Sequence, residues 1–150
     1  MTPCELLICA EDAMVNSYSP YSGFSVGAAL ITADGRVYKG CNIENSAFSP
    51  TICAERTAFF KAISEGENDF EAIAIVGKYK NGEYKHLCYP CGVCRQVMEE
   101  FCGGDFKIIL GDGKGEYEVH TLSELLPGGF DLRKELLLKI GTKLFRKSEG

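Results

Sequence analysis

Three cysteines at the starts of two predicted helices constrain this chain more than any other feature. Cys91 and Cys94 form a C-x-x-C pair directly after Pro90, and Cys53 follows the helix-start residues 49–51. A helix start exposes unpaired N–H groups and the positive end of the helix dipole, which stabilise a thiolate. Three thiolates are a ligand set that zinc prefers, and they leave its fourth tetrahedral position for water. The spacing therefore predicts two helix starts that meet at one metal ion.

Composition and charge exclude several classes of protein. The chain has 150 residues and eight cysteines but no long apolar run, and acidic residues interrupt the apolar stretch near its N-terminus. Without a secretion signal, metal or catalytic use of the cysteines is favoured over disulfides. Net charge is −5, and the six Lys/Arg against two acids in residues 132–150 leave an acidic body. We therefore expect a soluble, cytoplasmic protein with no nucleic-acid or membrane partner.

Hydrophobic periodicity and turn residues divide the chain into alternating helices and strands. Thr2, Pro3 and Glu5 are typical of a capping-box helix start. The expected helices cover residues 3–17, 52–64, 91–101 and 131–147, with a short helix and turn in 122–130. The expected strands cover residues 24–32, 36–43, 71–77, 106–112 and 116–120. This alternation predicts a layered α/β domain with about five strands in its sheet.

The tetrapeptide Ile-Cys-Ala-Glu occurs twice, and its surroundings give the two copies different roles. In the first copy, Cys9 and Glu11 lie in mid-helix, about 200° apart around the axis, so we interpret Cys9 as a packing residue. In the second copy, Glu55 lies two residues after Cys53 and close to the expected metal. A carboxylate beside a zinc-bound water can accept its proton and pass it to a substrate nitrogen, which makes Glu55 the candidate catalytic residue.

These motifs resemble those of the small, homotetrameric, zinc-dependent cytidine deaminases. The matching stretches are YSPYSGFSVGAAL, GCNIEN, CAERTA, PCGVCRQ and ELLPGGF, and the resemblance runs from Leu6 to Phe130. It implies a three-layer α/β/α fold with a mixed sheet and one Zn²⁺ per subunit in a homotetramer with shared active sites. The implied reaction is the hydrolytic deamination of cytidine and 2′-deoxycytidine to uridine and 2′-deoxyuridine plus ammonia, a step of pyrimidine salvage. We expect residues 1–130 to form the deaminase domain and residues 131–150 to form a basic amphipathic helix that extends it.

The resemblance also assigns roles to individual residues of this sequence. Glu55 would be catalytic. The metal ligands would be Cys53, Cys91 and Cys94. Substrate would be bound by Phe24 against the pyrimidine, by Asn42 and Glu44 at the ribose 3′-hydroxyl, by the backbone of Ala54 at the base edge, and by Phe130 reaching a neighbouring subunit's site. Arg56 and Arg95 would lie near the sulfurs and offset the net negative charge of a three-thiolate zinc site, although Arg95 could equally form a surface ion pair. Phe48 stands where many relatives carry tyrosine, so a hydroxyl contact from that position is absent.

Other interpretations of these residues remain open. Cys88 lies three residues before Cys91 and would complete a closed four-cysteine zinc site, or an iron–sulfur site, in a protein without enzymatic activity. A deaminase could also act on another aminopyrimidine, or on cytosine in RNA or DNA. His86 and His120 lie outside the ligand spacing and are interpreted as surface or strand residues. The leucine-rich stripe after Phe130 predicts a docked surface helix.

Overall fold

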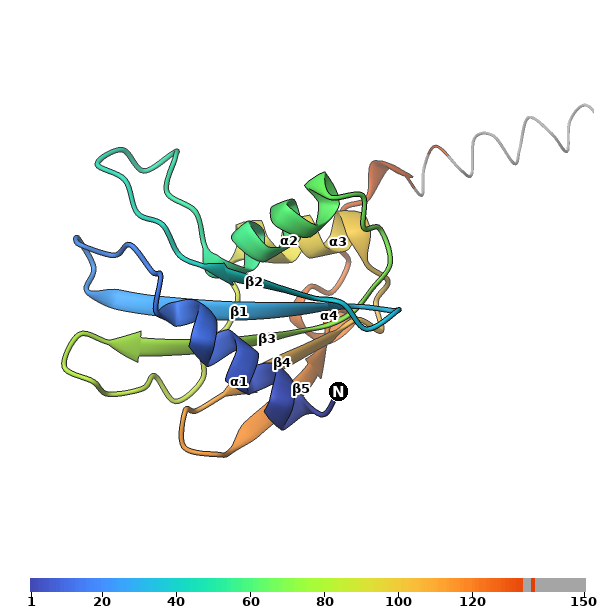
Figure 1. Ribbon diagram of the computed structural model, residues 1–150. Helices are drawn as coiled ribbons and strands as arrows, with labels where there is room; N and C mark the ends of the chain where they lie inside the picture. Colours follow the sequence, from blue (N-terminus) through green and yellow to red (C-terminus); the bar gives the residue numbers. More distant parts are fainter. Residues whose placement is uncertain (134–135, 137–150) are drawn as a thin grey trace, which may run out of the picture.

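A computed structural model describes residues 1–133 and 136 of the chain. Its centre is a sheet of five strands in the order β2-β1-β3-β4-β5 (Figure 1). The strands are β1 (Phe24–Thr32), β2 (Val37–Cys41), β3 (Phe70–Tyr79), β4 (Lys107–Gly111) and β5 (Tyr117–Thr121). Strands β3 and β4 are parallel and the other neighbours are antiparallel, so the sheet is mixed, as expected.

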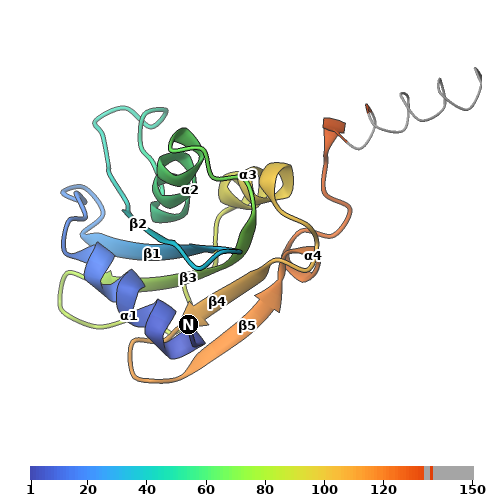
Figure 2. The same ribbon diagram turned by 45° about the vertical axis from the view of Figure 1, so that its right-hand side comes forward.

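Helices cover both faces of this sheet. The helices are α1 (Pro3–Met14), α2 (Ala54–Ser64), α3 (Gly92–Phe101) and the short α4 (Leu122–Leu125). Helix α1 lies on one face, and α2 and α3 lie side by side on the other (Figure 2). This arrangement confirms the three-layer α/β/α fold.

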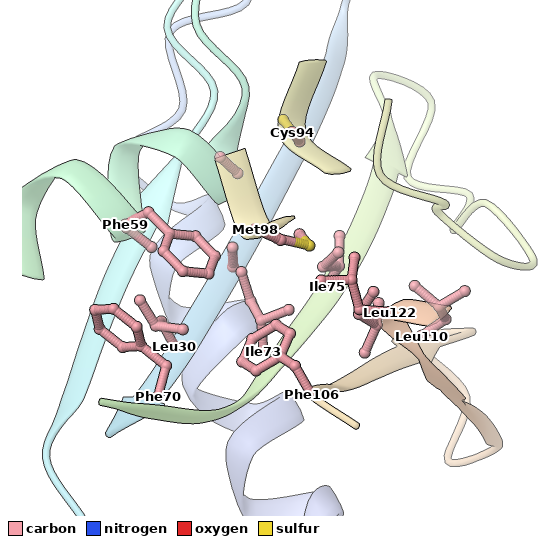
Figure 3. Close-up of a cluster of buried hydrophobic side chains, with 14 of the residues drawn as sticks. Leu30, Phe59, Phe70, Ile73, Ile75, Cys94, Met98, Phe106, Leu110 and Leu122 are labelled. Atoms are coloured by element: carbon pink, nitrogen blue, oxygen red, sulfur yellow. The ribbon is translucent and has the colours of Figure 1, made fainter. Parts of the chain in front are cut away.

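Alternate residues of the central strands enter two separate cores. In β3, Ile73 and Ile75 pack under α2 and α3, whereas Ala72 and Ala74 pack under α1. Burial of both faces explains why these strands are continuous apolar runs rather than alternating ones. The larger side chains gather on the α2/α3 side, and Figure 3 shows that this cluster extends up to Met98 and Cys94 of α3. The core thus supports the helix that carries the C-x-x-C pair.

Helix α1 lies directly on the backbone of β1. A Cβ atom at Gly27 would lie 1.8 Å from the carbonyl oxygen of Ala10, so only glycine allows this approach. The partly buried Cys9 packs against the core on this face, which agrees with a packing role. The first Ile-Cys-Ala-Glu copy therefore belongs to the layer opposite α2 and α3.

Two helix boundaries differ from the sequence-based prediction for local reasons. Helix α1 has the expected capping box between Thr2 and Glu5 but ends at Met14, and Tyr18 N–H donates instead to Asn42 O at 3.0 Å. Helix α2 begins at Ala54, because Ile52 pairs with Ile43 in a β-bridge. In both places a tertiary backbone contact ends the local helical pattern.

The helix predicted over residues 131–147 lies mostly outside the described residues. In the described part of the chain, no helix combines the length and apolar character needed to cross a membrane.

Candidate active site

Two helix N-termini bring three sulfur atoms together. Cys53 is the N-cap of α2 and Cys91 is the N-cap of α3, both with extended backbone, and Cys94 lies one turn into α3. An N-cap side chain usually accepts a hydrogen bond from the first turn of its helix. Neither cysteine makes such a bond, so both sulfurs remain available as ligands.

The spacing of the sulfurs suits a tetrahedral metal ion. Cys53 Sγ lies 3.7 Å from Cys91 Sγ, which lies 3.5 Å from Cys94 Sγ, and all three are within 4.8 Å of one another. A tetrahedral zinc with ligand bonds of about 2.3 Å separates its sulfurs by about 3.8 Å. The three residues therefore fit zinc, with one tetrahedral position left over.

The cysteines also interact through their protons. A hydrogen bond from Cys94 lowers the pKa of Cys53 to about 5, and the contact with Cys53 in turn raises the pKa of Cys94. One thiolate therefore forms readily, while its neighbour keeps a proton. Binding of a divalent metal releases such protons, because the thiolate is the ligand form.

Glu55 lies in the first turn of α2, and its side chain is buried. The residue is 4% exposed. Burial raises the pKa of this carboxyl to about 7, and the negative charge of Cys53 acts in the same direction. Desolvation disfavours the charged form, and a nearby cation opposes that effect. A carboxyl poised near neutral pH is suited to both accepting and donating a proton.

Two arginines lie beside the cysteines, but only one of them contacts a sulfur. Arg56 Nη2 donates to Cys53 Sγ at 3.5 Å. Arg95 donates to two backbone carbonyls, with Nε on Pro90 O at 2.8 Å and Nη1 on Leu125 O at 2.6 Å. No hydrogen bond from Arg95 to a sulfur is found in the described part of the chain. Arg95 thus ties the residue before Cys91 to the end of α4.

The expected substrate residues lie where β1 and β2 separate. Asn42 bonds to the start of β1, where Phe24 lies, and Glu44 Oε1 accepts from the backbone N–H groups of Tyr21 and Ser22 at 3.0 and 3.1 Å. A side-chain hydrogen bond from Ser22 is the largest cause of the lowered pKa of Glu44, and the two backbone bonds lower it further. Glu44 therefore carries an ionised carboxylate that is bonded to the segment before β1.

Phe130 is held by its backbone while its ring faces outward. Gln96 Nε2 donates to Phe130 O at 2.9 Å, and a Cβ atom at Gly129 would lie 2.7 Å from the buried carboxyl of Glu99. Gly128 has a φ of 64°, which favours glycine. The ring of Phe130 is nonetheless 61% exposed. The turn thus presents an aromatic side chain outside the core of its own chain.

Cys88 and His120 lie apart from the three sulfurs. The sulfur of Cys88 would lie 3.1 Å from a Cβ atom at Gly77, and Cys88 is absent from the ligand cluster found among the described residues. Burial raises the pKa of Cys88 to about 12, so it stays a thiol. The ring of His120 is tilted by 50° against that of Tyr89, and His120 Nε2 lies 2.9 Å from Glu118 Oε2 on β5. Neither residue closes the metal site in this geometry.

Two glycines that position the site were missed by motif analysis. A Cβ atom at Gly40 would lie 2.4 Å from Ala54 O and 2.5 Å from Ala58 N, so β2 touches the first turns of α2. A Cβ atom at Gly77 would lie 2.4 Å from Phe24 Cζ. A glycine within a strand is a signal for such close approach, but it does not name the neighbour.

A fold of this kind with a three-sulfur site and a buried glutamate defines a class of zinc-dependent hydrolase. Residues 2–110 match the family model described as the cytidine and deoxycytidylate deaminase zinc-binding region. The chain belongs to this family. The resemblance seen in the sequence and the zinc cofactor that it implied are confirmed.

Within the family, the chain is similar to proteins named cytidine deaminase. It is 49% identical to that of Sporosarcina psychrophila, covering 84% of this chain and 89% of the relative. It is 51% identical to that of Halalkalibacterium halodurans, covering 81% and 88%. The crystal structure of the cytidine deaminase from Burkholderia pseudomallei superposes with a TM-score of 0.79 at 42% identity, covering 87% of this chain and all of that one.

Proposed function

We propose that this protein hydrolyses free cytidine and 2′-deoxycytidine to uridine and 2′-deoxyuridine plus ammonia. The observation that carries the proposal is the buried carboxyl of Glu55, which lies two residues after Cys53. Cys53 supplies one of the three sulfurs whose spacing suits a tetrahedral metal ion. A structural zinc site is closed by four protein ligands, so it does not require a buried carboxyl beside it. Relatives named cytidine deaminase, similar over most of their length, support the choice of substrate.

The residues of the site divide the chemistry between them. Cys53, Cys91 and Cys94 hold zinc, which when bound is a Lewis acid that makes a water molecule nucleophilic at neutral pH. Glu55 accepts the proton of the nucleophile, delivers it to ring nitrogen N3, and passes a second proton to the leaving amine at C4. Water supplies the new oxygen and ammonia departs. Arg56 withdraws charge from Cys53 through its hydrogen bond.

The residues around Phe24 select a base that carries a sugar. Phe24 forms one face of the pyrimidine site, and the backbone of Ala54 bonds the base edge. Asn42 and Glu44 bind the ribose 3′-hydroxyl, since a hydroxyl can accept from an amide and donate to a carboxylate at once. The body of the chain is acidic, which opposes binding of an RNA or DNA backbone. Free nucleosides are therefore the favoured substrates.

The proposal includes an assembly with shared sites. Phe130 is 61% exposed and Phe48 is 95% exposed, and rings this exposed are suited to contact another subunit. A homotetramer in which Phe130 stacks on the base in a neighbouring site would cover them. Residues 131–150 would extend the same domain as residues 1–130. None of the eight cysteines forms a disulfide in the described structure, which fits the cytoplasm.

An ultraviolet assay of cytidine conversion tests the function. The zinc-loaded protein is expected to convert cytidine to uridine, to lose this activity with a chelator, and to regain it when zinc is returned. Deoxycytidylate and a cytosine-containing oligonucleotide are assayed in parallel. Preference for either of these over cytidine would overturn the nucleoside assignment, and full activity without metal would overturn the zinc mechanism.

A further inference from the structure

The side chain of Asn42 takes the place of a missing piece of strand. Strand β2 pairs with β1 only as far as Cys41, opposite Gly27, and Asn42 N–H still reaches Val26 O at 3.3 Å. Beyond that point the side-chain amide of Asn42 continues the ladder. Its Oδ1 accepts from Val26 N–H at 2.9 Å, and its Nδ2 donates to Phe24 O at 2.8 Å.

The contacts determine which way the amide faces. The backbone N–H of Val26 can only donate, so the amide atom that it meets is the oxygen, and the hydroxyl of Ser17 donates to the same atom. The amide nitrogen therefore faces Phe24 O. One of its two N–H groups is used there, and the other remains for a ligand. Asn42 can thus hold β1 and bind a sugar hydroxyl at the same time.

The ring of Phe24 packs closely against residues of β3, the strand on the other side of β1. A Cβ atom at Gly77 would lie 2.4 Å from Phe24 Cζ, and the ring centroid lies 4.9 Å from that of Tyr79. Both contacts come from β3, which pairs with β1 along its whole length. A small shift of the first residues of β1 would therefore disrupt the contacts of the ring with Gly77 and Tyr79. On the side of β1 where β2 has ended, the two amide bonds of Asn42 restrain both Phe24 and Val26, while the hydroxyl of Ser22 accepts from Phe24 N–H at 3.0 Å.

We propose that Asn42 is a positioning residue for Phe24, which it holds in the orientation that stacks on the pyrimidine. This role is separate from the contact between Asn42 and the ribose, and it rests on the proposed function. It predicts that loss of the amide harms substrates that have no 3′-hydroxyl at all. Glu44 has no bond to Phe24 in the described structure, so the prediction distinguishes Asn42 from the other expected ribose ligand.

The test measures deamination of cytidine and of 3′-deoxycytidine by wild type, Asn42→Ala, Phe24→Ala and the double variant. On 3′-deoxycytidine we expect Asn42→Ala to lower kcat/KM roughly tenfold, within the range for one base–aromatic stack. The loss should fall on KM, with zinc content unchanged. In the Phe24→Ala background, Asn42→Ala should then change kcat/KM by less than about twofold, because residues that act through one another are not additive. Asn81→Ala, which removes an amide from an exposed turn, is the matched control and should leave both substrates unaffected.

Several outcomes would overturn the proposal. If Asn42→Ala has the same kcat/KM on 3′-deoxycytidine as the wild type, Asn42 acts only by binding the ribose 3′-hydroxyl. If the loss persists in full without the Phe24 ring, Asn42 acts elsewhere. Should Asn42→Ala fold poorly, Asn42→Asp carries the same test, since it keeps the shape of the side chain but sets a carboxylate oxygen, which cannot donate, against Phe24 O. Absence of cytidine turnover in the wild type would instead refute the proposed function itself.

Discussion

Substitution of Gly40 by alanine tests whether β2 sets the position of α2, the helix that carries Glu55. The added Cβ would lie 2.4 Å from Ala54 O, 2.5 Å from Ala58 N and 3.1 Å from Ala58 Cα. All three atoms belong to the backbone of α2, so no side-chain rotation can relieve the overlap. To restore an ordinary contact of 3.4 Å, the start of α2 must retreat from the sheet by about 1 Å.

That displacement acts on the residues with the strictest geometry. Helix α2 carries Glu55, and Cys53 caps it, whereas Cys91 and Cys94 belong to α3 and would stay behind. Misplacement of a catalytic group by 1 Å can cost about 10²-fold in rate. Overpacking also costs about 1–3 kcal/mol of unfolding free energy. We therefore expect Gly40→Ala to fold, to bind zinc more weakly, and to lose about two orders of magnitude in kcat/KM.

The assay combines cytidine turnover, zinc content and thermal unfolding of the same preparations. Lys39→Ala is the matched control, because Lys39 is the exposed neighbour of Gly40 in β2 and surface substitutions usually change stability by less than about 0.5 kcal/mol. If Gly40→Ala keeps wild-type kcat/KM and a full complement of zinc, α2 is not positioned by its contact with β2, and the reasoning fails.

Other substitutions test separate parts of the structure. Glu55→Gln should retain zinc and lose about 10²–10⁴-fold in kcat, measured by ultraviolet absorbance, because it cannot carry the proton; near-normal turnover would end its assignment. Cys88→Ala should retain zinc, measured by metal analysis, and activity, whereas a closed four-cysteine site would lose its metal. Gly129→Ala should raise KM and destabilise the protein by about 1–3 kcal/mol in denaturant unfolding, since its Cβ would meet Glu99 beside the base of the Phe130 turn; an unchanged KM would argue against a role for that turn. Thr2→Ala should lower the free energy of unfolding by about 1 kcal/mol through loss of the capping box and leave kcat/KM unchanged.

Local sequence was sufficient for much of the fold. Pro50 and Thr51 before Cys53, and Pro90 before Cys91, indicate helix starts. In the structure, α2 and α3 begin within two residues of the predicted positions. The apolar runs predict strands, and the capping box at Thr2 predicts the first helix. These features could be identified because each depends on neighbours a few residues away along the chain.

The residues that orient the site could not be recognised in the same way. Arg95 follows Cys94, and its place in the motif left open whether it lies near the sulfurs or forms a surface ion pair; its donors reach the carbonyls of Pro90 and Leu125. The direction of a side chain depends on which carbonyls the packing of α3 against α4 brings close. The position of Leu125 relative to α3 is not encoded in the spacing of a short motif.

The sequence by itself predicted the candidate metal ligands, the glutamate two residues after Cys53 and the alternation of helices and strands, because these predictions depend on short-range spacing and periodicity. Only the tertiary structure decided that Gly40 lies against α2 and that the amide of Asn42 bonds to β1. Both depend on the register of β1 against β2 and on how closely a helix packs on a sheet. Distant segments set these contacts jointly, so no single stretch of the chain contains them.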